Sequence, residues 1–398
     1  MRVAMLGWEF PPFMSGGLGV HCFELTHALC DMGVEIDFFM PVSGKQISSP
    51  FPGLRIIEVA KTSLRPYLTV SKTSQKADYG RNLIAAVNEY AARCCDSVEA
   101  HSKERKYDVM HAHDWLTAQA GIRLKASLHV PLVQTFHSTE FDRTSWPWEY
   151  VLDIEKAAAA NADMLIAVSN RTRAQVMRLG AEERKIRVIY NGVDRGKFAS
   201  VKLEMASIEE LKKKKKIVLF LGRLTEQKGP VQFLHSAKRV LQVNPNVVFV
   251  VAGRGELLPL LINMTLDLGI SQNVRFLGYV SDDDQQKIYK IADVYVMPST
   301  SEPFGITALE AMSSGVPVII SKTSGVAEIV KSAIKVDFWD ISAMAMKILA
   351  VLAHAPLARA MVRLSSHETA HYTWAKTAEE TLKVYHETMA RVHGGKNQ

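Results

Sequence analysis

The chain has 398 residues, which predicts two or more domains because a single domain usually holds about 100–200 residues. Hydrophobic residues make up 47% and charged residues 22%, proportions that exclude a largely disordered chain and allow buried cores. The net charge of +7 is modest for this length and does not by itself indicate a nucleic-acid-binding protein.

In the first half of the chain, short apolar runs alternate with a helical pattern. Residues 1–7 predict a buried strand, residues 23–32 have apolar residues at helical spacing, and residues 34–41 alternate as in a second strand. Further short strands that end at polar residues are predicted at 108–113, 130–136, 164–168 and 188–190. Ligands bind at the carboxyl ends of strands in an open parallel sheet, so these polar residues are candidates for a functional site.

The second half repeats this architecture. Between residues 196 and 216 the apolar pattern fades and lysines accumulate, which predicts a connection between two domains. Strands are then predicted at 217–221, 247–252, 274–276, 294–297 and 316–320. Residues 375–391 hold good helix formers and predict a closing helix. The predicted fold class is therefore α/β, with two parallel-sheet halves of similar size.

Three turns that follow predicted strands can bind phosphate. SGGLG, residues 15–19, lies between the first strand and the first helix, where glycines let backbone N–H groups approach an anion. Arg223 and Lys228, in LGRLTEQKG, can meet a diphosphate, the arginine through its planar fork and the lysine as a point charge. GRGE, residues 253–256, offers a similar turn. Each of these motifs also fits an ordinary turn or a surface loop without a ligand.

The segment STSEPFGITALEAMSSGVP, residues 299–317, is the most informative. With a helix predicted from Phe304, Glu302 lies just before the helix and Glu310 about two turns along it, near the same face. Amide groups at the start of the helix can bind phosphate or sugar oxygens. One carboxylate would then hold sugar hydroxyls and the other ribose hydroxyls. Taken alone, Glu310 also fits an ordinary helix carboxylate.

Histidines follow two strands of the first half. His111, His113 and Asp114 lie in HAHD, and His137 follows the next strand. The HxH spacing occurs in zinc sites, but local spacing offers no third ligand. We therefore predict that these residues line a sugar-binding cleft and hold no metal. His111 also fits a packed strand residue.

Other features favour a cytoplasmic protein. No apolar run reaches the ~18 residues that span a bilayer, and the N-terminus lacks the pattern of a signal peptide. The cysteines have no CxxC spacing and are predicted to be reduced thiols: Cys22, Cys30, Cys94 and Cys95. The lysine run at 212–216 is predicted to be a solvated linker or helix face.

In this order, the motifs resemble those of the retaining glycosyltransferases of GT-B fold in family GT4, with glycogen and starch synthases among their relatives. The matching segments cover nearly the whole chain: GGL, HAHDW, TFHSTEF, AVSNRT, IYNGVD, GRLTEQKG, VAGRGE, FLGYVS and PSTSEPFGITALEAMSSGVPVI. The resemblance implies two Rossmann-like, doubly wound domains that face each other across a cleft. Residues 1–196 would form the acceptor-side domain, residues 197–370 the nucleotide-sugar-binding domain, and residues 371–398 a helix that packs back on the first domain.

The resemblance also implies roles for residues of the second half. Arg223 and Lys228 match the pair that holds the donor diphosphate, Glu302 the glutamate that contacts the donor sugar, and Glu310 the ribose-binding glutamate. The remaining donor-binding positions are Gly253, Tyr279 against the base, the backbone of Phe304 and Gly305, and Thr307.

In the first half, His137 and Asp114 match residues beside the transferred sugar, and Gly16 and Gly17 match a loop that closes on the phosphates. His137, Asp114, Glu302, Arg223 and Lys228 form the implied catalytic set. Glu9 is a weaker candidate, because the prolines around it differ from the glycogen synthase pattern. The sequence FMS, residues 13–15, replaces a lysine that bacterial glycogen synthases tend to carry before GGL, which argues against ADP-glucose glycogen synthase activity.

The implied function is retaining transfer of a hexosyl group, glucosyl foremost, from a UDP- or ADP-sugar to an α-glucan. A small sugar, a sugar phosphate or a lipid is the alternative acceptor. No metal cofactor is expected, because Asp282 to Asp284 fit a helix N-cap with acidic first-turn residues better than a metal-binding DxD motif. No nucleic-acid partner is expected, and membrane contact would be weak and peripheral. A nucleotide-sugar epimerase or hydrolase, which would consume donor without acceptor, and a non-catalytic binding protein are the alternatives from other classes.

Overall fold

The computed structural model describes residues 1–13, 16–42, 47–61, 76–199 and 215–394. It divides into two compact units. We call Met1–Asn191 together with Trp374–Gln398 the N-terminal unit, and Gly192–Thr373 the C-terminal unit. The chain thus passes from one unit to the other after Asn191 and again after Thr373. The boundaries expected from the sequence were after residues 196 and 370, a few residues away from each. Most of the predicted lysine run, residues 212–214, lies outside the described residues.

The described part of the N-terminal unit contains a seven-stranded parallel sheet in the order β3-β2-β1-β4-β5-β6-β7. Its strands are β1 (Arg2–Leu6), β2 (Glu35–Val42), β3 (Leu54–Lys61), β4 (Val109–His113), β5 (Leu132–Phe136), β6 (Met164–Ala167) and β7 (Ile186–Val188). Its helices are α1 (Gly17–Asp31), α2 (Lys76–Glu104), α3 (Asp114–Leu128), α4 (Glu140–Arg143), α5 (Glu149–Asn161), α6 (Asn170–Arg178) and α15 (Trp374–Gly394). Strands β1, β4, β5 and β6 are buried along their whole length, which explains their short apolar sequences.

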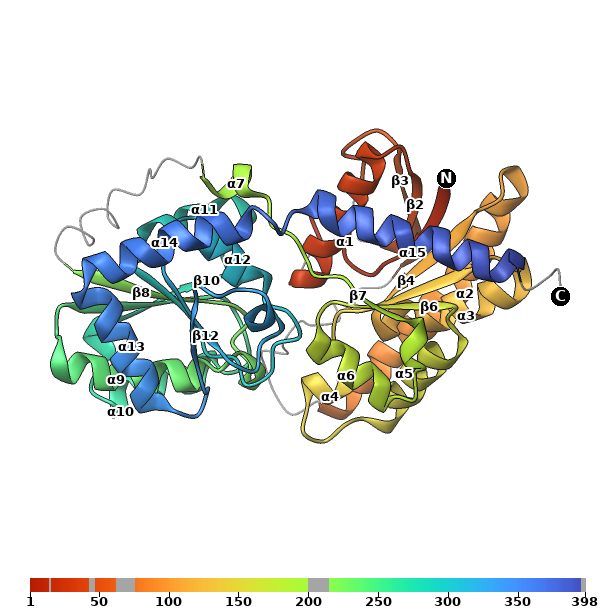
Figure 1. Cartoon of the computed structure of the whole chain (residues 1–398). Coiled ribbons are helices and arrows are strands. Elements are labelled where there is room, and N and C mark those ends of the chain that lie inside the picture. Colours follow the sequence, from red (N-terminus) through yellow and green to blue (C-terminus); the bar gives the residue numbers. More distant parts are fainter. Residues whose placement is uncertain (14–15, 43–46, 62–75, 200–214, 395–398) are drawn as a thin grey trace. The chain divides into compact units, whose positions relative to one another are not determined.

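In the C-terminal unit, a six-stranded parallel sheet has the order β10-β9-β8-β11-β12-β13. Its strands are β8 (Lys216–Leu221), β9 (Val247–Ala252), β10 (Val274–Gly278), β11 (Val294–Met297), β12 (Val318–Ser321) and β13 (Ile334–Val336). Its helices are α7 (Arg195–Ala199), α9 (Pro230–Val243), α10 (Leu258–Asp267), α11 (Asp282–Ile291), α12 (Ile306–Ser313), α13 (Ile341–Ala353) and α14 (Ala355–Thr369). Helices α9, α10 and α13 cover one face of this sheet, and α11, α12 and α14 the other (Figure 1). Short 3-10 helices lie at Glu183–Lys185 in the N-terminal unit and at Glu226–Lys228, Ser271–Asn273 and Gly325–Glu328 in this one.

Both sheets are doubly wound, because strand order reverses direction beside the first strand of each unit. This confirms the predicted fold class of two Rossmann-like domains. One local prediction needs correction: the N-cap of α11 is Ser281, whose hydroxyl accepts the N–H of Asp284, and residues 282–284 begin the helix itself. The serine hydroxyl satisfies an amide that the helix leaves unbonded.

Helix α15 packs on α1 within the N-terminal unit (Figure 1). The hydroxyl of Thr377 donates to the carbonyl oxygen of Tyr190 over 2.9 Å, and Arg187 pairs with Glu387. Among the described residues, no single helix has both the length and the apolar character to cross a membrane. The bent pair Ile341–Ala353 and Ala355–Val392 passes that test by length and composition only.

Candidate functional site

Two hydrogen bonds between backbone groups connect three loops at the carboxyl end of the sheet in the C-terminal unit. The N–H of Leu224, after β8, donates to the carbonyl oxygen of Arg254, after β9, over 2.9 Å. The N–H of Thr300, after β11, donates to the carbonyl oxygen of Gln227 over 2.9 Å. The loops that carry the predicted donor-binding residues therefore form one connected surface.

Gly253 allows two of these loops to approach closely. Its φ is +137°, and a Cβ at this position would lie 1.9 Å from the carbonyl oxygen of Gly222. Its N–H donates to the carbonyl oxygen of Gly278, at the end of β10, over 2.7 Å. A residue with a side chain would push the loops apart. The sequence predicts Gly253 as a donor-binding residue, and the structure gives it a packing role at the same position.

Lys228 and Glu302, both predicted site residues, form an ion pair. The Nζ atom of Lys228 lies 2.6 Å from Oε2 of Glu302, and the hydroxyl of Ser299 donates to the same oxygen over 3.2 Å. Glu302 is buried, whereas the Lys228 side chain is 22% exposed. The ammonium group is therefore within reach of a ligand while the carboxylate is held in place. Arg223, which follows β8, is half-buried.

Helix α12 starts later than the sequence predicts. Gly305 is its N-cap, with a φ of +106° that ends the extended segment, and the helix begins at Ile306. Glu310 consequently lies about one turn into the helix rather than two. The first amides of a helix have no partner within it, so α12 presents its amide end near Glu302.

Glu310 is buried and accepts two hydrogen bonds from α11. Its Oε2 atom accepts the side-chain amide N–H of Gln285 over 2.6 Å and the hydroxyl of Tyr289 over 2.9 Å. Burial, and next the charge of Glu310, raise the pKa of Tyr289 well above its usual value, so the phenol stays protonated and donates. The sequence reasoning missed Gln285 and Tyr289, which lie at an i, i+4 spacing on one face of a predictable helix.

Three other predicted positions in this unit differ in their exposure. Tyr279 is 60% exposed, and the guanidinium carbon of Arg254 lies 5.6 Å from the centroid of its ring. Phe304 is buried, and its carbonyl oxygen accepts a backbone N–H. The hydroxyl of Thr307 accepts that of Tyr295 over 2.9 Å. Of the two aromatic residues, only Tyr279 therefore exposes its ring to a ligand.

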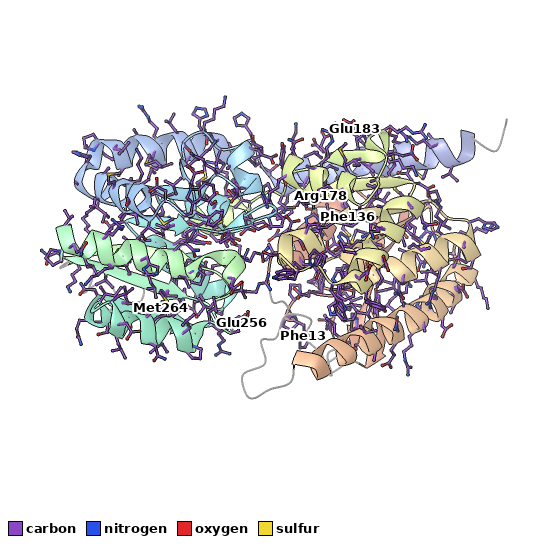
Figure 2. All side chains as sticks on the ribbon, turned by 90° about the horizontal axis from the view of Figure 1, so that it is seen from below. Phe13, Phe136, Arg178, Glu183, Glu256 and Met264 are labelled. Atoms are coloured by element: carbon purple, nitrogen blue, oxygen red, sulfur yellow. The ribbon has the colours of Figure 1, made fainter. Side chains whose placement is uncertain are left out.

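In the N-terminal unit, three histidines converge beside the ends of β4 and β5. His137 comes directly after Phe136, which lies inside the unit (Figure 2). Nδ1 of His113 lies 3.0 Å from Nε2 of His137, and the ring centroid of His21, on α1, lies 4.3 Å from that of His137. Among the described residues, these three form a group that could hold a metal ion, with one ligand atom each, all within 4.8 Å of one another. The third histidine, which local spacing could not reveal, therefore comes from a helix distant in the sequence.

These imidazoles are neutral near pH 7. Burial lowers the pKa of His21 to about 4 and holds those of His113 and His137 well below their usual range. Nδ1 of His21 lies 2.7 Å from the side-chain oxygen of Asn191, which can only accept, so Nδ1 carries the proton. The Nε2 atoms of His21 and His113 are buried without a hydrogen-bond partner within the described structure. The lone pair on Nε2 of His21 can accept a sugar hydroxyl or bind a metal, whereas Nε2 of His113 accepts or donates a hydrogen bond according to its tautomer.

His111 is a packed strand residue. Its Nδ1 atom lies 2.7 Å from the hydroxyl of Tyr385 on α15, and its Nε2 atom lies 2.7 Å from that of Thr135. Burial lowers its pKa to about 3. The structure therefore supports the interpretation of His111 as a packed strand residue, which the sequence analysis gave as the alternative to a site residue.

Asp114 shapes the segment that follows β5. It starts α3 with a φ of +55°, and its Oδ1 atom accepts the N–H of His137 over 2.7 Å and that of Ser138 over 3.4 Å. Burial raises its pKa to about 6, against the opposing charge of Arg143 and these two N–H groups. The carboxylate of Asp114 thus holds the backbone of the segment that carries His137 in place. Of the other candidates here, Gly16 and Gly17 are exposed at the start of α1 and Glu9 is buried.

Two Rossmann-like units, one of them with the amide end of a helix and an ion pair at its sheet edge, fit the class of GT-B glycosyltransferases. The comparisons agree with this class. The family model described as "Glycosyl transferases group 1" matches residues 201–365, and the model "Glycosyltransferase Family 4" matches residues 15–197.

Relatives and solved structures cover almost the whole chain. An uncharacterized glycosyltransferase of Methanocaldococcus jannaschii is 30% identical over 97% of this chain and 98% of its own. A glycogen synthase of Mycobacterium tuberculosis is 28% identical over 97% of this chain and 94% of its own. The sucrose-phosphate synthase of Thermosynechococcus elongatus superposes with a TM-score of 0.80 at 21% identity, covering 98% of this chain and 99% of its own. The chain belongs to the glycosyltransferase 4 family and is a glycosyltransferase.

The buried histidines predict a protein that loses stability in acid. The unfolded chain protonates histidines near pH 6.5. In the folded chain the pKa of His21 is lowered to about 4 and that of His111 to about 3, and burial holds those of His113 and His137 well below their usual range. Between these values the unfolded state binds up to four more protons, so stability falls as the pH falls. Asp114 and Glu155, with pKa values raised to about 6 and 7, oppose this because the folded state binds their protons more tightly.

Near pH 5 the four histidines outweigh the two acids, so the free energy of unfolding should fall as the pH falls, by about 1.4 kcal/mol per pH unit for each net proton that the unfolded state binds in excess. Thermal unfolding midpoints at pH 7, 6 and 5 would measure this trend, and His113→Asn should reduce its slope. A midpoint that rises on acidification would contradict the predicted burial of neutral histidines.

Proposed function

We propose that this enzyme transfers a hexosyl group, glucosyl foremost, from a UDP- or ADP-sugar to an α-glucan with retention of configuration. The observation that carries the proposal is the contact between Lys228 and Glu302 at the carboxyl end of the C-terminal sheet. Solved relatives support the donor class: Anabaena HepE is described in complex with UDP-glucose, and starch synthase IV of Arabidopsis thaliana bound to ADP and acarbose. We also propose a cytoplasmic location, consistent with four free cysteines.

For donor binding, we assign the diphosphate to Arg223 and Lys228. An ammonium group has three donors, so Lys228 can bind a phosphate oxygen and keep its bond to Glu302. If Lys228 moves toward the phosphate, Ser299 still donates to the Glu302 carboxylate over 3.2 Å and keeps it positioned for sugar hydroxyls. The amide end of α12, with Gly305 and Thr307, adds a partial positive charge for phosphate.

The nucleoside is assigned to Glu310, Tyr279 and the turn at Gly253. Glu310 would accept ribose hydroxyls while Gln285 and Tyr289 fix its orientation from α11. Tyr279, with its exposed ring, would lie against the base. In the N-terminal unit, we assign Gly16 and Gly17 to the phosphates and the buried lone pairs beside His137 to the transferred sugar, with Asp114 as the residue that positions His137.

The proposed chemistry is front-face transfer. As the bond from the sugar carbon to the donor phosphate breaks, the acceptor hydroxyl bonds to the same face and its proton passes to the leaving phosphate. Arg223 and Lys228 offset the negative charge that grows on the diphosphate, so catalysis is mostly positioning and charge stabilisation.

A small acceptor is the second candidate. D-inositol 3-phosphate glycosyltransferases are also relatives, and the one from Corynebacterium jeikeium is 29% identical over the whole of this chain. That identity is close to the value for the glycogen synthase, so a sugar phosphate acceptor has support of its own. An epimerase or hydrolase would differ from both candidates by consuming donor without an acceptor.

The proposal predicts acceptor-stimulated release of nucleoside diphosphate from UDP- or ADP-glucose. Glu302→Ala and Lys228→Ala should each lower the rate by about 10²–10³-fold, because each removes a preorganised charge at the reacting centre. Lys322→Ala is the matched control, since Lys322 forms a 2.7 Å ion pair with Asp337 on the surface of the same unit.

The measurement compares UDP-, ADP- and GDP-sugars with glycogen, maltooligosaccharides or inositol phosphate as acceptors. Loss of activity in Lys322→Ala as well would point to a folding defect. Full release without any acceptor would replace the transferase proposal by a hydrolase or epimerase.

We further propose that no metal cofactor is needed. Exhaustive treatment with a chelator should leave the transfer rate unchanged, because the charges on the diphosphate are met by side chains and amides. If chelation abolished activity and Zn²⁺ restored it in the wild type but not in His21→Ala, the group of His21, His113 and His137 would be a metal centre and this proposal would be wrong.

A further inference from the structure

An exposed aromatic segment follows α4 and runs into the first turn of α5 in the N-terminal unit. We call residues 144–150, with the sequence TSWPWEY, the tryptophan loop. Trp146 is 89% exposed and Trp148 is 40% exposed. Among the described residues of this unit, the only other large hydrophobic side chain with comparable exposure is Met177. Exposed indole rings in one short loop are costly in water, which indicates a binding role.

The loop is held in a defined conformation. The N–H of Trp146 donates to the hydroxyl of Thr144 over 3.1 Å, and that of Trp148 donates to Oε1 of Glu140 over 3.2 Å. Pro147 restricts the backbone between the two indoles. The exposed rings are therefore presented by a fixed backbone, which lowers the entropy lost on binding.

A buried ion network connects this loop to the candidate site. Arg143 contacts Oε2 of Glu140 over 3.0 Å and Oε1 of Glu155 over 2.5 Å. The same guanidinium donates to the hydroxyl of Ser138 over 2.8 Å, and Ser138 follows His137 in the chain. The tryptophan loop thus lies at the same end of the sheet as the histidine that we assign to the transferred sugar.

The chemistry of the loop favours a neutral saccharide as its ligand. Its large exposed side chains are aromatic rather than aliphatic, and Glu149 is its only charged residue, so it offers no cation to a phosphate or an anionic membrane. The C–H-rich face of a pyranose packs on an aromatic ring, while its hydroxyls remain hydrated. The ring centroid of Tyr150 lies 5.7 Å from that of Trp148, which extends the aromatic surface.

We propose that Trp146 and Trp148 form a stacking platform that binds sugar residues of an α-glucan chain outside the reacting end. This inference rests on the proposed function, and it selects a polymer over a small acceptor. A chain held by the loop raises the local concentration of acceptor ends, as expected for two linked binding events.

The test measures glucan binding separately from turnover. Wild-type protein and Trp146→Ala are compared by affinity electrophoresis in native gels that contain glycogen, and by titration with maltoheptaose. Loss of one stacking contact should weaken binding on the order of tenfold, the size of effect seen when an aromatic side chain that stacks on a nucleic-acid base is replaced by alanine. Trp146→Phe should recover much of the affinity, because a phenyl ring still stacks. Trp146 is almost fully exposed, so its replacement leaves the fold unchanged.

Trp339→Ala is the matched control, since Trp339 is 63% exposed in the C-terminal unit. It should bind glycogen like the wild type, and donor turnover with a small maltooligosaccharide should be equal in all variants. Equal glycogen retardation of wild type and Trp146→Ala, or equal loss in Trp339→Ala, would overturn the platform. So would flotation with phosphatidylcholine vesicles that depends on Trp146, because the loop would then be a membrane contact.

The two proposals fail in different ways. Turnover on glycogen without any contribution of Trp146 to binding would refute the platform and leave the transferase intact. Trp146-dependent glycogen binding without turnover on any donor would support the platform and refute the proposed transfer.

Discussion

The common carboxyl edge of parallel strands is the constraint on which both candidate regions depend. Loops that follow parallel strands all leave the sheet at one end, whatever their separation in the chain. In the C-terminal unit this brings Lys228 to 2.6 Å from Glu302 across 74 residues of sequence. In the N-terminal unit it brings His113 to 3.0 Å from His137. Glycine at positions such as 253 then lets neighbouring loops approach to a distance that no other residue allows.

The two edges differ in their electrostatics. The C-terminal edge carries an ion pair with a reachable ammonium group and the positive end of a helix, a combination suited to an anionic ligand. The N-terminal edge carries buried imidazoles that burial keeps neutral, with unpaired Nε2 atoms on His21 and His113. Neutral acceptors of this kind suit hydroxyl groups, so the two edges favour ligand groups of different chemistry, one charged and the other neutral. Leaving polar atoms unpaired costs stability, and the structure accepts that cost where a ligand would satisfy them.

The features that could be predicted from the sequence are those that depend on local patterns of residues. The buried strands, the turns after them and the order of motifs were sufficient for the fold class and for assigning Lys228 and Glu302 to one candidate site. His21 and Asn191 could not be predicted, because their contact spans 170 residues and depends on how α1 packs. The start of α12 was placed two residues early, since Gly305 also fits a helix interior in sequence and only its left-handed φ excludes that. Gln285 and Tyr289 were missed because their partner, Glu310, lies on another helix.

Overall similarity to the relatives leaves the acceptor of this chain open between two types. The glycogen synthase and the inositol phosphate glycosyltransferase among the relatives are 28% and 29% identical to this chain, so overall similarity does not separate a polymer from a small acceptor. The tryptophan loop lies between TFHSTEF and AVSNRT and belongs to neither motif. It nevertheless contacts the first motif directly, because the N–H of Trp148 donates to Oε1 of Glu140 over 3.2 Å. A segment outside the family motifs with a fixed connection to the candidate site is the kind of element that can set specificity without disturbing the chemistry.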